Sequence, residues 1–545
     1  MTASMDLRKL ADDYFQCAMV ASPFTASLFG APGFEHLVPD LSAEAAAETA
    51  SRLDEIAANA RSLTDSSLSE IDRVTRDVLL HEAQRVVDEV RAPNVAISVS
   101  SVLSPTLSAI NAMSKASVVD DAYRQRLAAL PVMFGQAVQR HRDGAAAGLT
   151  PVGTGVRQVV GQLEATLALP LDQDPLLRPP GATEADRELV RNVVRPALRA
   201  YVDALRDAVL PIARDDEHSG VCHVPDGAKL YEQALAGHTT LSRTPEQVHA
   251  LGLELCQQLR EEYAELGETV FGTRDVETVV ARLRDDLDLR YTTPQQIVTD
   301  ARGALTRAQQ ASREWFGHLP VAPCDVEEMD ALEAPHQVLG YYHPPGHDRP
   351  GRHWINTFQP YTRARYEYEA LAFHESVPGH HTQIALSQEM GDDVPAFRRY
   401  GYVTAFSEGW ALYTERLADE MGLYSGDLAR FGMLSFDSWR ACRLVVDTGI
   451  HAFGWSRQRG IDFMWANSAL TRANISNEVD RYIAWPGQAC AYMTGRLEID
   501  RLRRESQESL GSRFEIKEFH DTVLGNGGLP LAVLSNVVGR WSANR

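Results

Sequence analysis

A proline and a glycine interrupt a predicted helix that begins near Tyr366. The apolar residues between Tyr366 and Val377 recur at helical spacing, which is typical of one buried helix face. Pro378 has no N–H to donate, and its ring would collide with the carbonyl group of His374, four residues earlier. The helix must therefore bulge, widen or restart at Pro378 and Gly379.

Three histidines and a glutamate surround this interruption, namely His374, Glu375, His380 and His381. The first two open like the motif HExxH, in which two histidines bind one zinc ion and the glutamate activates a water molecule. Pro378 stands where that motif has its second histidine. A regular helix would bring His381 back to the face of His374, whereas an inserted two-residue bulge would bring His380 there. Both histidines therefore stay open as the second ligand.

The clustering of these side chains in an apolar segment favours a metal site over hydrogen-bonded structural histidines. A third ligand is expected downstream, and the best candidate is Glu408, early on a helix whose apolar residues repeat up to Leu417. The structural alternative for Glu408 is a first-turn carboxylate that the helix dipole stabilises. Glu415 and Glu420 compete as ligands, but their positions are more natural for a solvated helix end.

These motifs resemble a known group of enzymes. The His-Glu pair, the Gly-His after the proline and the Phe-x-Glu that ends at Glu408 resemble the gluzincin metallopeptidases, among which helical enzymes of the angiotensin-converting-enzyme and oligopeptidase type fit best. The variant His-Glu-x-x-x-Pro-Gly-His-His, followed by Ser-Glu-Gly-Trp-Ala-Leu-Tyr, is similar to the bacterial domain-of-unknown-function family 885. Further hallmarks of that family lie at 443–451, 478–488 and 519–521.

The resemblance is strong from about residue 230 to the C-terminus. It implies a mainly α-helical, two-lobed metallopeptidase fold with a deep central cleft, and zinc as the cofactor. It supplies no substrate. The predicted division is an N-terminal helical region, 1–230, that forms a cleft wall, and a metallohydrolase region, 231–545, that carries the zinc site.

Two further residues are candidates for stabilising an oxyanion. Arg481-Tyr482 resembles the Arg-Tyr of angiotensin-converting-enzyme-like sequences, whose tyrosine hydroxyl donates to the tetrahedral intermediate. A phenol suits this task because it is a donor aimed where negative charge develops. His451 is a weaker candidate, since a histidine that ends a helix is often a satisfied cap. The structural alternative for Tyr482 is a tyrosine packed on a helix.

The net charge and the cysteine pattern exclude several classes of binding partner and structural site. The formal net charge of −21 argues against nucleic acid and against anionic membranes. The six cysteines include no CxxC pair, so neither a zinc knuckle nor a disulfide framework is indicated. The first residues contain no apolar signal core and no stretch is long enough to span a membrane, which predicts a cytoplasmic protein. The oligomeric state is not predicted.

The remaining pattern predicts mostly helices and one hairpin. Residues 65–90 should form a helix that begins at Thr64 or Asp65 as its N-cap. Thr244-Pro245 and Thr293-Pro294 are typical of a capping threonine followed by proline in the first turn. Residues 338–342 and 353–358 flank a loop rich in proline and glycine, which predicts a β-hairpin before the His-Glu helix. Its free edge could hydrogen-bond an extended peptide.

We therefore expect a zinc-dependent hydrolase that cleaves amide bonds in short peptides or small molecules. His374, Glu408 and either His380 or His381 would hold the metal, and Glu375 would act as the general base. Tyr482, with His451, would stabilise the oxyanion. The alternatives are an amidase or esterase of a small metabolite, and a metal-free helical ligand-binding protein.

Overall fold

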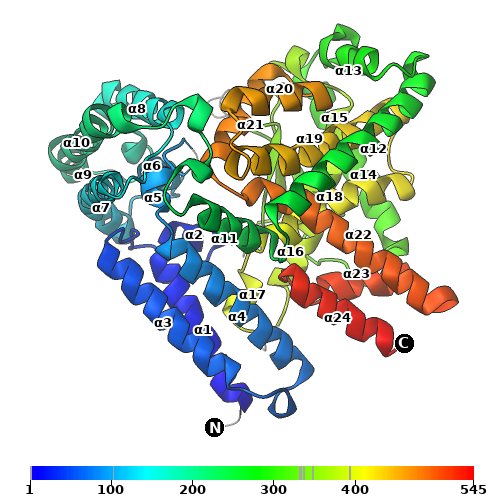
Figure 1. The fold of residues 1–545 in the computed structure, drawn as a ribbon, viewed down its shortest axis with the longest axis horizontal. Coiled ribbons are helices and arrows are strands. Elements are labelled where there is room, and N and C mark those ends of the chain that lie inside the picture. Colours follow the sequence, from blue (N-terminus) through cyan, green and yellow to red (C-terminus); the bar gives the residue numbers. More distant parts are fainter. Residues whose placement is uncertain (1–2, 102, 331–333, 335–337, 347–348, 392–393) are drawn as a thin grey trace. The chain divides into compact units, whose positions relative to one another are not determined.

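The computed structural model describes residues 3–101, 103–330, 334, 338–346, 349–391 and 394–545. The described chain is mainly α-helical with one small β-sheet (Figure 1), which confirms the mainly α-helical part of the predicted fold class. Two compact units divide it. The first contains Met1–Ala234, Gly449–Gly460 and Ser476–Pro486, and the second contains Leu235–Thr448, Ile461–Ile475 and Gly487–Arg545.

Most of the helices lie entirely within one unit. The first unit contains α1 (Ala3–Ala21), α2 (Pro23–Phe29), α3 (Ala43–Arg61), α4 (Glu70–Arg91), α5 (Asn94–Ile97), α6 (Pro105–Ser114), α7 (Asp121–Ala146), α8 (Gly153–Ala168), α9 (Glu184–Leu189) and α10 (Arg195–Ala204). The second contains α12 (Pro245–Phe271), α13 (Val276–Asp285), α14 (Pro294–Ala311), α15 (Glu367–Glu375), α16 (His380–Gln388), α17 (Ala396–Arg399), α18 (Thr404–Glu420), α22 (Ala491–Leu510), α23 (Ile516–Leu524) and α24 (Leu531–Ala543). The division falls within α11 (Gly227–Thr239), α19 (Asp427–His451), α20 (Arg457–Asn467) and α21 (Arg472–Ala484).

Helix starts follow the capping residues. Thr244 and Thr293 each accept a hydrogen bond from the third residue of their helix and form a complete capping box, with proline in the first turn, as predicted. The predicted start of α4 was wrong. Ser69 caps this helix by accepting from the amide of Asp72, while Asp65 lies in a separate short 3₁₀ turn. Serine, threonine and aspartate all cap helices well, so residue type alone does not distinguish Thr64 or Asp65 from Ser69 as the cap.

The sheet lies in the second unit and has the strand order β1-β3-β2. The strands β2 (Gly340–His343) and β3 (Gly351–Ile355) are antiparallel, which confirms the predicted hairpin. The strand β1 (Cys324–Glu328) pairs with β3 in parallel, with Val326 opposite His353, and it was not predicted. Its three acidic residues and short length give a weak strand pattern, because only Cys324 and Val326 are buried.

The sheet and the surrounding helices share an apolar core that includes the α15 residues beside the histidines. Ile355 of β3, Leu371 and Phe373 of α15 and Ile297 of α14 belong to one buried cluster. Tyr368 adds a hydrogen bond from its hydroxyl to the carbonyl of Asn356 at 3.1 Å. This packing fixes α15 against the sheet.

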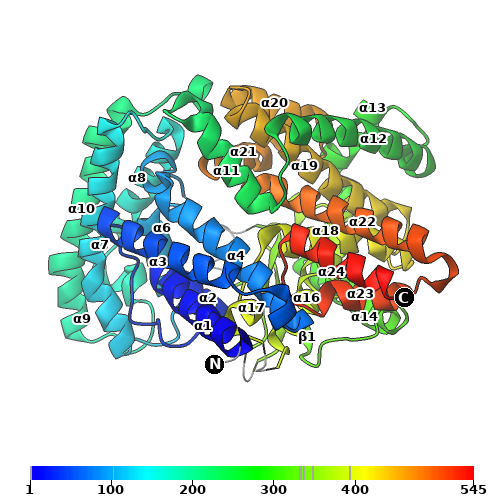
Figure 2. The ribbon, with the colours of Figure 1, turned by 60° about the horizontal axis from the view of Figure 1, so that its bottom comes forward.

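The helices α18 and α22 pack against each other (Figure 2), and two glycines lie where their backbones approach closely. A Cβ on Gly409 would lie 2.5 Å from the backbone of Gly495, and a Cβ on Gly495 would lie 1.8 Å from the carbonyl oxygen of Ala405. Side chains would push the two helices apart at this point. The close crossing therefore positions Glu408, which lies next to Gly409 on α18.

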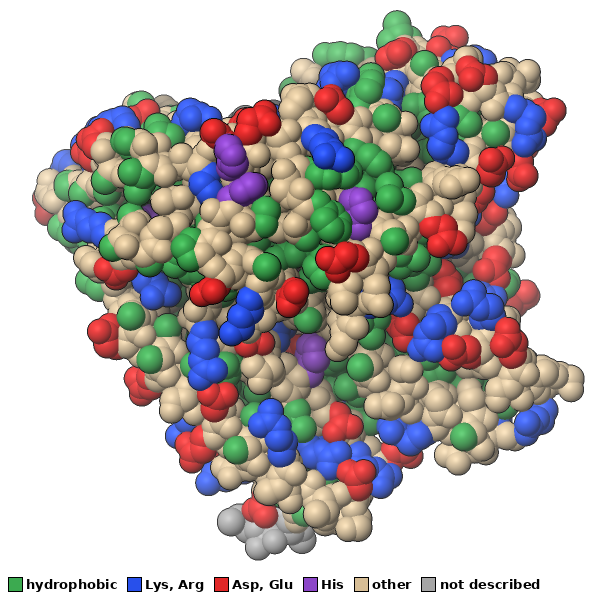
Figure 3. Space-filling model, viewed as in Figure 1, with side chains coloured by type: hydrophobic (Ala, Val, Ile, Leu, Met, Phe, Trp, Pro, Cys, Tyr) green, Lys and Arg blue, Asp and Glu red, His purple; other side chains and the backbone are tan. Residues whose placement is uncertain are grey.

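Charged side chains of both signs are interspersed over the face that Figure 3 shows. Many of the carboxylates pair with arginine within one helix or across neighbouring helices, as in Arg85–Glu89 and Arg430–Asp419. Exposed pairs of this kind contribute little to stability, about 0–1 kcal/mol each. They do moderate the repulsion that a net charge of −21 would otherwise create.

Candidate metal centre

The helix interruption predicted at Pro378 and Gly379 is present, and it takes the form of a restart. The helix α15 ends at Glu375, the peptide bond between Val377 and Pro378 is cis, and α16 begins at His380. The indole N–H of Trp410, on α18, donates to the carbonyl of Pro378 at 3.0 Å. The interruption is thus held against the helix that carries Glu408.

Gly379 allows the two helices to meet. A Cβ at this position would lie 2.0 Å from the carbonyl oxygen of His374 and 2.4 Å from that of Phe373. Both atoms belong to the backbone, which cannot move aside as a flexible side chain would. The glycine therefore brings His380, at the start of α16, close to His374, at the end of α15.

We expect Gly379→Ala to separate the two histidines and to destabilise the protein. Overpacking of this kind costs about 1–3 kcal/mol, and we expect the affinity for a divalent metal to fall as well. Thermal unfolding and metal titration measure the two effects. Gly391→Ala is the matched control, because a Cβ there meets nothing within 4 Å. Equal behaviour of the two variants would contradict this role of Gly379.

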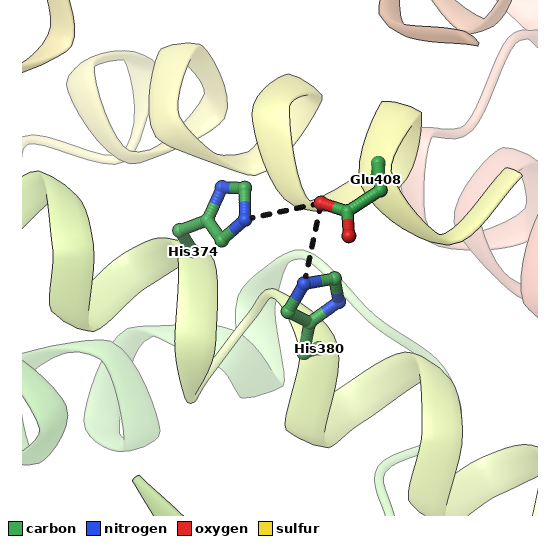
Figure 4. Close-up of side chains that lie close together, drawn as sticks. All are labelled: His374, His380 and Glu408. Carbon is green, nitrogen blue, oxygen red and sulfur yellow. Dashed lines mark ion pairs between the residues drawn. The ribbon is translucent and has the colours of Figure 1, made fainter. Parts of the chain in front are cut away.

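His374, His380 and Glu408 form one buried group that could hold a metal ion (Figure 4). The Oε2 atom of Glu408 lies 3.5 Å from Nε2 of His374 and 3.6 Å from Nε2 of His380. All three ligand atoms lie within 4.8 Å of one another. Ligands about 2.0 Å from a tetrahedral zinc ion lie about 3.3 Å apart. The two separations from Glu408 are close to this value, so the three side chains could hold such an ion.

His381 is directed to different partners. Its Nε2–H donates to the carbonyl of Ala322 at 3.0 Å, and its Nδ1 accepts from the hydroxyl of Tyr342, on β2, at 2.9 Å. Both ring nitrogens are therefore engaged beside the sheet. Of the two histidines that the sequence left open, His380 lies in the group and His381 does not.

The three side chains stabilise one another electrostatically. Burial disfavours the charge of Glu408, but the two histidines outweigh it and hold the pKa of this carboxyl well below its usual range. Burial also disfavours protonation of His374, yet its hydrogen bonds to Glu408 and Glu415 raise the pKa to about 9. A proton on His374 must leave when the ring nitrogen binds a metal.

Glu415 contacts the ring nitrogen of His374 that does not face Glu408. Its side chain is fully buried, and its Oε1 lies 2.8 Å from Nδ1 of His374. A carboxylate on the second ring nitrogen of a ligand histidine fixes the ring orientation and the tautomer. The interpretation of Glu415 as part of a solvated helix end was therefore wrong. A usable signal existed, because Glu415 follows Glu408 by seven residues and so shares its helix face.

We expect Glu415→Ala to weaken metal binding about 10–100-fold, the usual effect of removing such a support. Glu420→Ala is the control on the same helix, since Glu420 is partly exposed and pairs with Arg503. Calorimetric titration with zinc compares the two variants. Unchanged affinity in Glu415→Ala would show that His374 holds its orientation without the carboxylate.

Two more side chains complete the surroundings of the group. The hydroxyl of Tyr402 donates to Oε1 of Glu408 at 2.8 Å, which leaves Oε2 directed at the histidines. No motif in the sequence singles out Tyr402. Glu375 is 9% exposed and close enough for its charge to act on His374 and Tyr402. Among the described residues, no side chain or backbone group forms a hydrogen bond or ion pair with its carboxylate.

The chain matches the family described as "Bacterial protein of unknown function (DUF885)" over residues 23–538. The chain belongs to this family. The match covers nearly the whole chain, including the region before residue 230, where the sequence resemblance alone was weak. No protein in the set of curated proteins matches the chain.

Two solved structures share the fold of this DUF885 chain. One is a candidate lipoprotein from Colwellia psychrerythraea, 24% identical, with a TM-score of 0.92 and coverage of 100% of both chains. The other is a candidate lipoprotein of unknown function from Shewanella oneidensis, 19% identical, with a TM-score of 0.77 and coverage of 97% of this chain and 99% of that one. Among the described helices, none is both long and apolar enough to cross a bilayer.

Tyr482 and His451 lie in the first unit, whereas the histidine-glutamate group lies in the second. The hydroxyl of Tyr482 donates to Glu478 at 2.8 Å. His451 is fully buried; its Nε2–H donates to the carbonyl of Tyr482 at 2.9 Å, and its Nδ1 accepts from the amide of Val221 at 3.2 Å. Both nitrogens of His451 are thus used in the structure of its unit, as expected of a satisfied histidine. The oxyanion role of Tyr482 stays a prediction.

Proposed function

We propose that this DUF885 chain is a zinc-dependent hydrolase that cleaves amide bonds in short peptides. The observation that supports it best is the convergence of His374, His380 and Glu408, with Glu375 directly after the first histidine and without a partner among the described residues. A structural group would be expected to satisfy every buried charge. A carboxylate left available beside three metal-binding side chains suits a general base.

The donor set favours zinc. Two imidazole nitrogens and one carboxylate oxygen are the ligands of many catalytic zinc sites, which keep a fourth position open. An ion held there would polarise a carbonyl group and lower the pKa of a water molecule. The three oxygens or more that calcium or magnesium prefer are missing from this group.

The side chains around the ion would position the ligands and transfer protons. His374 would be kept in one tautomer by Glu415, and Glu408 would be kept in place by Tyr402. Glu375 would accept a proton from the attacking water and return it to the leaving amine. The gluzincin-like arrangement with a deep cleft, and the assignment of Tyr482 as oxyanion donor, are parts of the same proposal.

Cleavage of a peptide library tests this function. Protein purified without a histidine tag and supplemented with zinc would be incubated with an equimolar library of N-acetylated tripeptides, and products would be identified by mass spectrometry. We expect cleavage that a chelator abolishes and that added zinc restores. Cleavage of small amides or esters alone would indicate a metabolite hydrolase, and the absence of any bound metal would indicate a ligand-binding protein.

Two cellular locations, the cytoplasm and the cell envelope, are compatible with different observations. The sequence predicts the cytoplasm, whereas the two structural relatives are described as candidate lipoproteins. Fractionation of the source cells, with detection of the chain in the soluble and membrane fractions, decides between these locations.

A further inference from the structure

Two histidines with exposed rings, His218 and His223, lie side by side in the first unit and form a surface pair. Their ring centres are 5.0 Å apart and their ring planes meet at 85°. The corresponding values for His374 and His380 are 4.8 Å and 85°. Two imidazoles whose nitrogens bind one ion at about 2.0 Å have ring centres about 4.5–5.2 Å apart. The surface pair therefore has the spacing of two ligands of one metal ion.

A carboxylate orients one ring of the surface pair. The Oδ1 atom of Asp215 lies 2.8 Å from Nδ1 of His218. Glu415 contacts the corresponding nitrogen of His374 at the same distance of 2.8 Å. A carboxylate on Nδ1 fixes the ring and its tautomer, so Nε2 carries the lone pair that a metal ion needs. Among the described residues, no group forms a hydrogen bond with Nε2 of His218 or with the ring of His223.

The backbone that carries the surface pair is fixed by hydrogen bonds. Nη1 of Arg214 donates to the carbonyl groups of His218 and Ser219 at 3.0 and 3.1 Å. Oδ1 of Asp215 accepts from the amides of Glu217 and His218 at 3.1 and 2.9 Å. The two rings therefore meet on a loop that is already ordered, and an ion that binds them loses little affinity to the ordering of the chain.

The charges around the surface pair favour a bound cation. Three consecutive acidic residues precede it in the sequence, namely Asp215, Asp216 and Glu217. Their negative charge attracts a metal cation to this part of the surface. Partial burial, together with the positive charges of His218 and Arg214, lowers the pKa of His223. Its ring is therefore neutral near pH 7, as a metal ligand must be.

We propose that the surface pair is a second metal site, which binds Cu²⁺ through one nitrogen of each imidazole and completes the coordination with water. In the part of the chain that the structure describes, only the buried group of His374, His380 and Glu408 brings three ligand atoms together. A site with two nitrogens and open water positions suits copper, which binds such ligands more tightly than the other divalent first-row ions and accepts a tetragonal arrangement. The site is independent of the proposed hydrolase.

Copper titration of the full-length chain tests this site. The wild type, His218→Ala and His223→Ala would be titrated with Cu²⁺ by calorimetry, in a buffer with excess glycine that masks weak binding. The buried group contributes equally to all three proteins, so a difference between them reports the surface pair. Binding by two rings on one chain exceeds binding by one ring about 10²–10⁴-fold, so each substitution should remove one equivalent of tightly bound copper.

Both side chains are exposed, so their replacement should leave the fold intact, which circular dichroism checks. Copper binding by His218→Ala and His223→Ala that equals that of the wild type would overturn the proposal. An effect of only one of the two substitutions would overturn it as well, because the site requires both rings.

His318→Ala is the matched control. The side chain of His318 is 82% exposed, and its Nδ1 lies 2.9 Å from Oδ2 of Asp521. No other described ring contacts it, so it has the histidine–aspartate pair without a second imidazole. Its copper binding should equal that of the wild type. A loss as large as that in His223→Ala would show that one exposed histidine is sufficient, and would overturn the two-ring site.

Zinc retention separates the surface pair from the buried group. After zinc supplementation and exhaustive dialysis, His223→Ala should retain as much zinc as the wild type, because two imidazoles without a third ligand do not hold zinc under these conditions. Loss of the retained zinc in His223→Ala would overturn the assignment of the surface pair as a separate copper site.

Discussion

Replacing His380 or Glu408 by alanine is expected to abolish stoichiometric zinc binding and to leave a folded helical protein. Each change removes one of three ligands, and two ligands rarely retain zinc in competition with water. His374→Ala should abolish binding too, but it also leaves the buried carboxylate of Glu415 without its partner, so His380→Ala separates metal loss from unfolding more clearly.

His381→Ala is the control for this experiment. It removes a neighbouring histidine whose nitrogens bond to Ala322 and Tyr342, so the zinc content should stay near that of the wild type. Elemental analysis after dialysis measures the content of each variant, and circular dichroism measures the fold. Full zinc retention by His380→Ala and Glu408→Ala would contradict the assigned ligands.

Glu375→Gln is expected to keep the metal and to lower kcat about 10²–10⁴-fold, because a general base usually contributes this much. Glutamine has nearly the same shape and cannot accept the proton. Glu375 has no partner among the described residues, so the substitution should leave stability almost unchanged. Kinetics on any peptide that the wild type cleaves, with zinc content measured in parallel, gives the comparison. Turnover within a few-fold of the wild type would exclude Glu375 as the base.

The helix interruption could be predicted because it follows from local chemistry. Proline cannot continue the hydrogen bonding of α15, and the two histidines beside it are visible in the sequence. The choice between His380 and His381 could not be made, since helical periodicity relates residues only within one continuous helix. Once α16 starts anew at His380, the backbone of the interruption decides which histidine faces His374.

The residues that support the ligands were harder to predict. Glu415 looks solvated in the sequence because charged residues follow it up to Glu420, yet its side chain is fully buried. What buries it is packing against helices that are distant along the chain. Strand β1 was missed for the same reason, because it pairs with a strand more than twenty residues later. Tyr402 lies only six residues before Glu408, but it precedes α18, so helical periodicity does not relate the two residues.

Zinc content of the wild-type chain, purified without a histidine tag, tests the central claim most directly. After supplementation with zinc and exhaustive dialysis, elemental analysis should give about one zinc ion per chain, as a three-ligand site with an open fourth position binds. A chain that retains no zinc under these conditions, while folded, would contradict the metal centre and the hydrolase built on it.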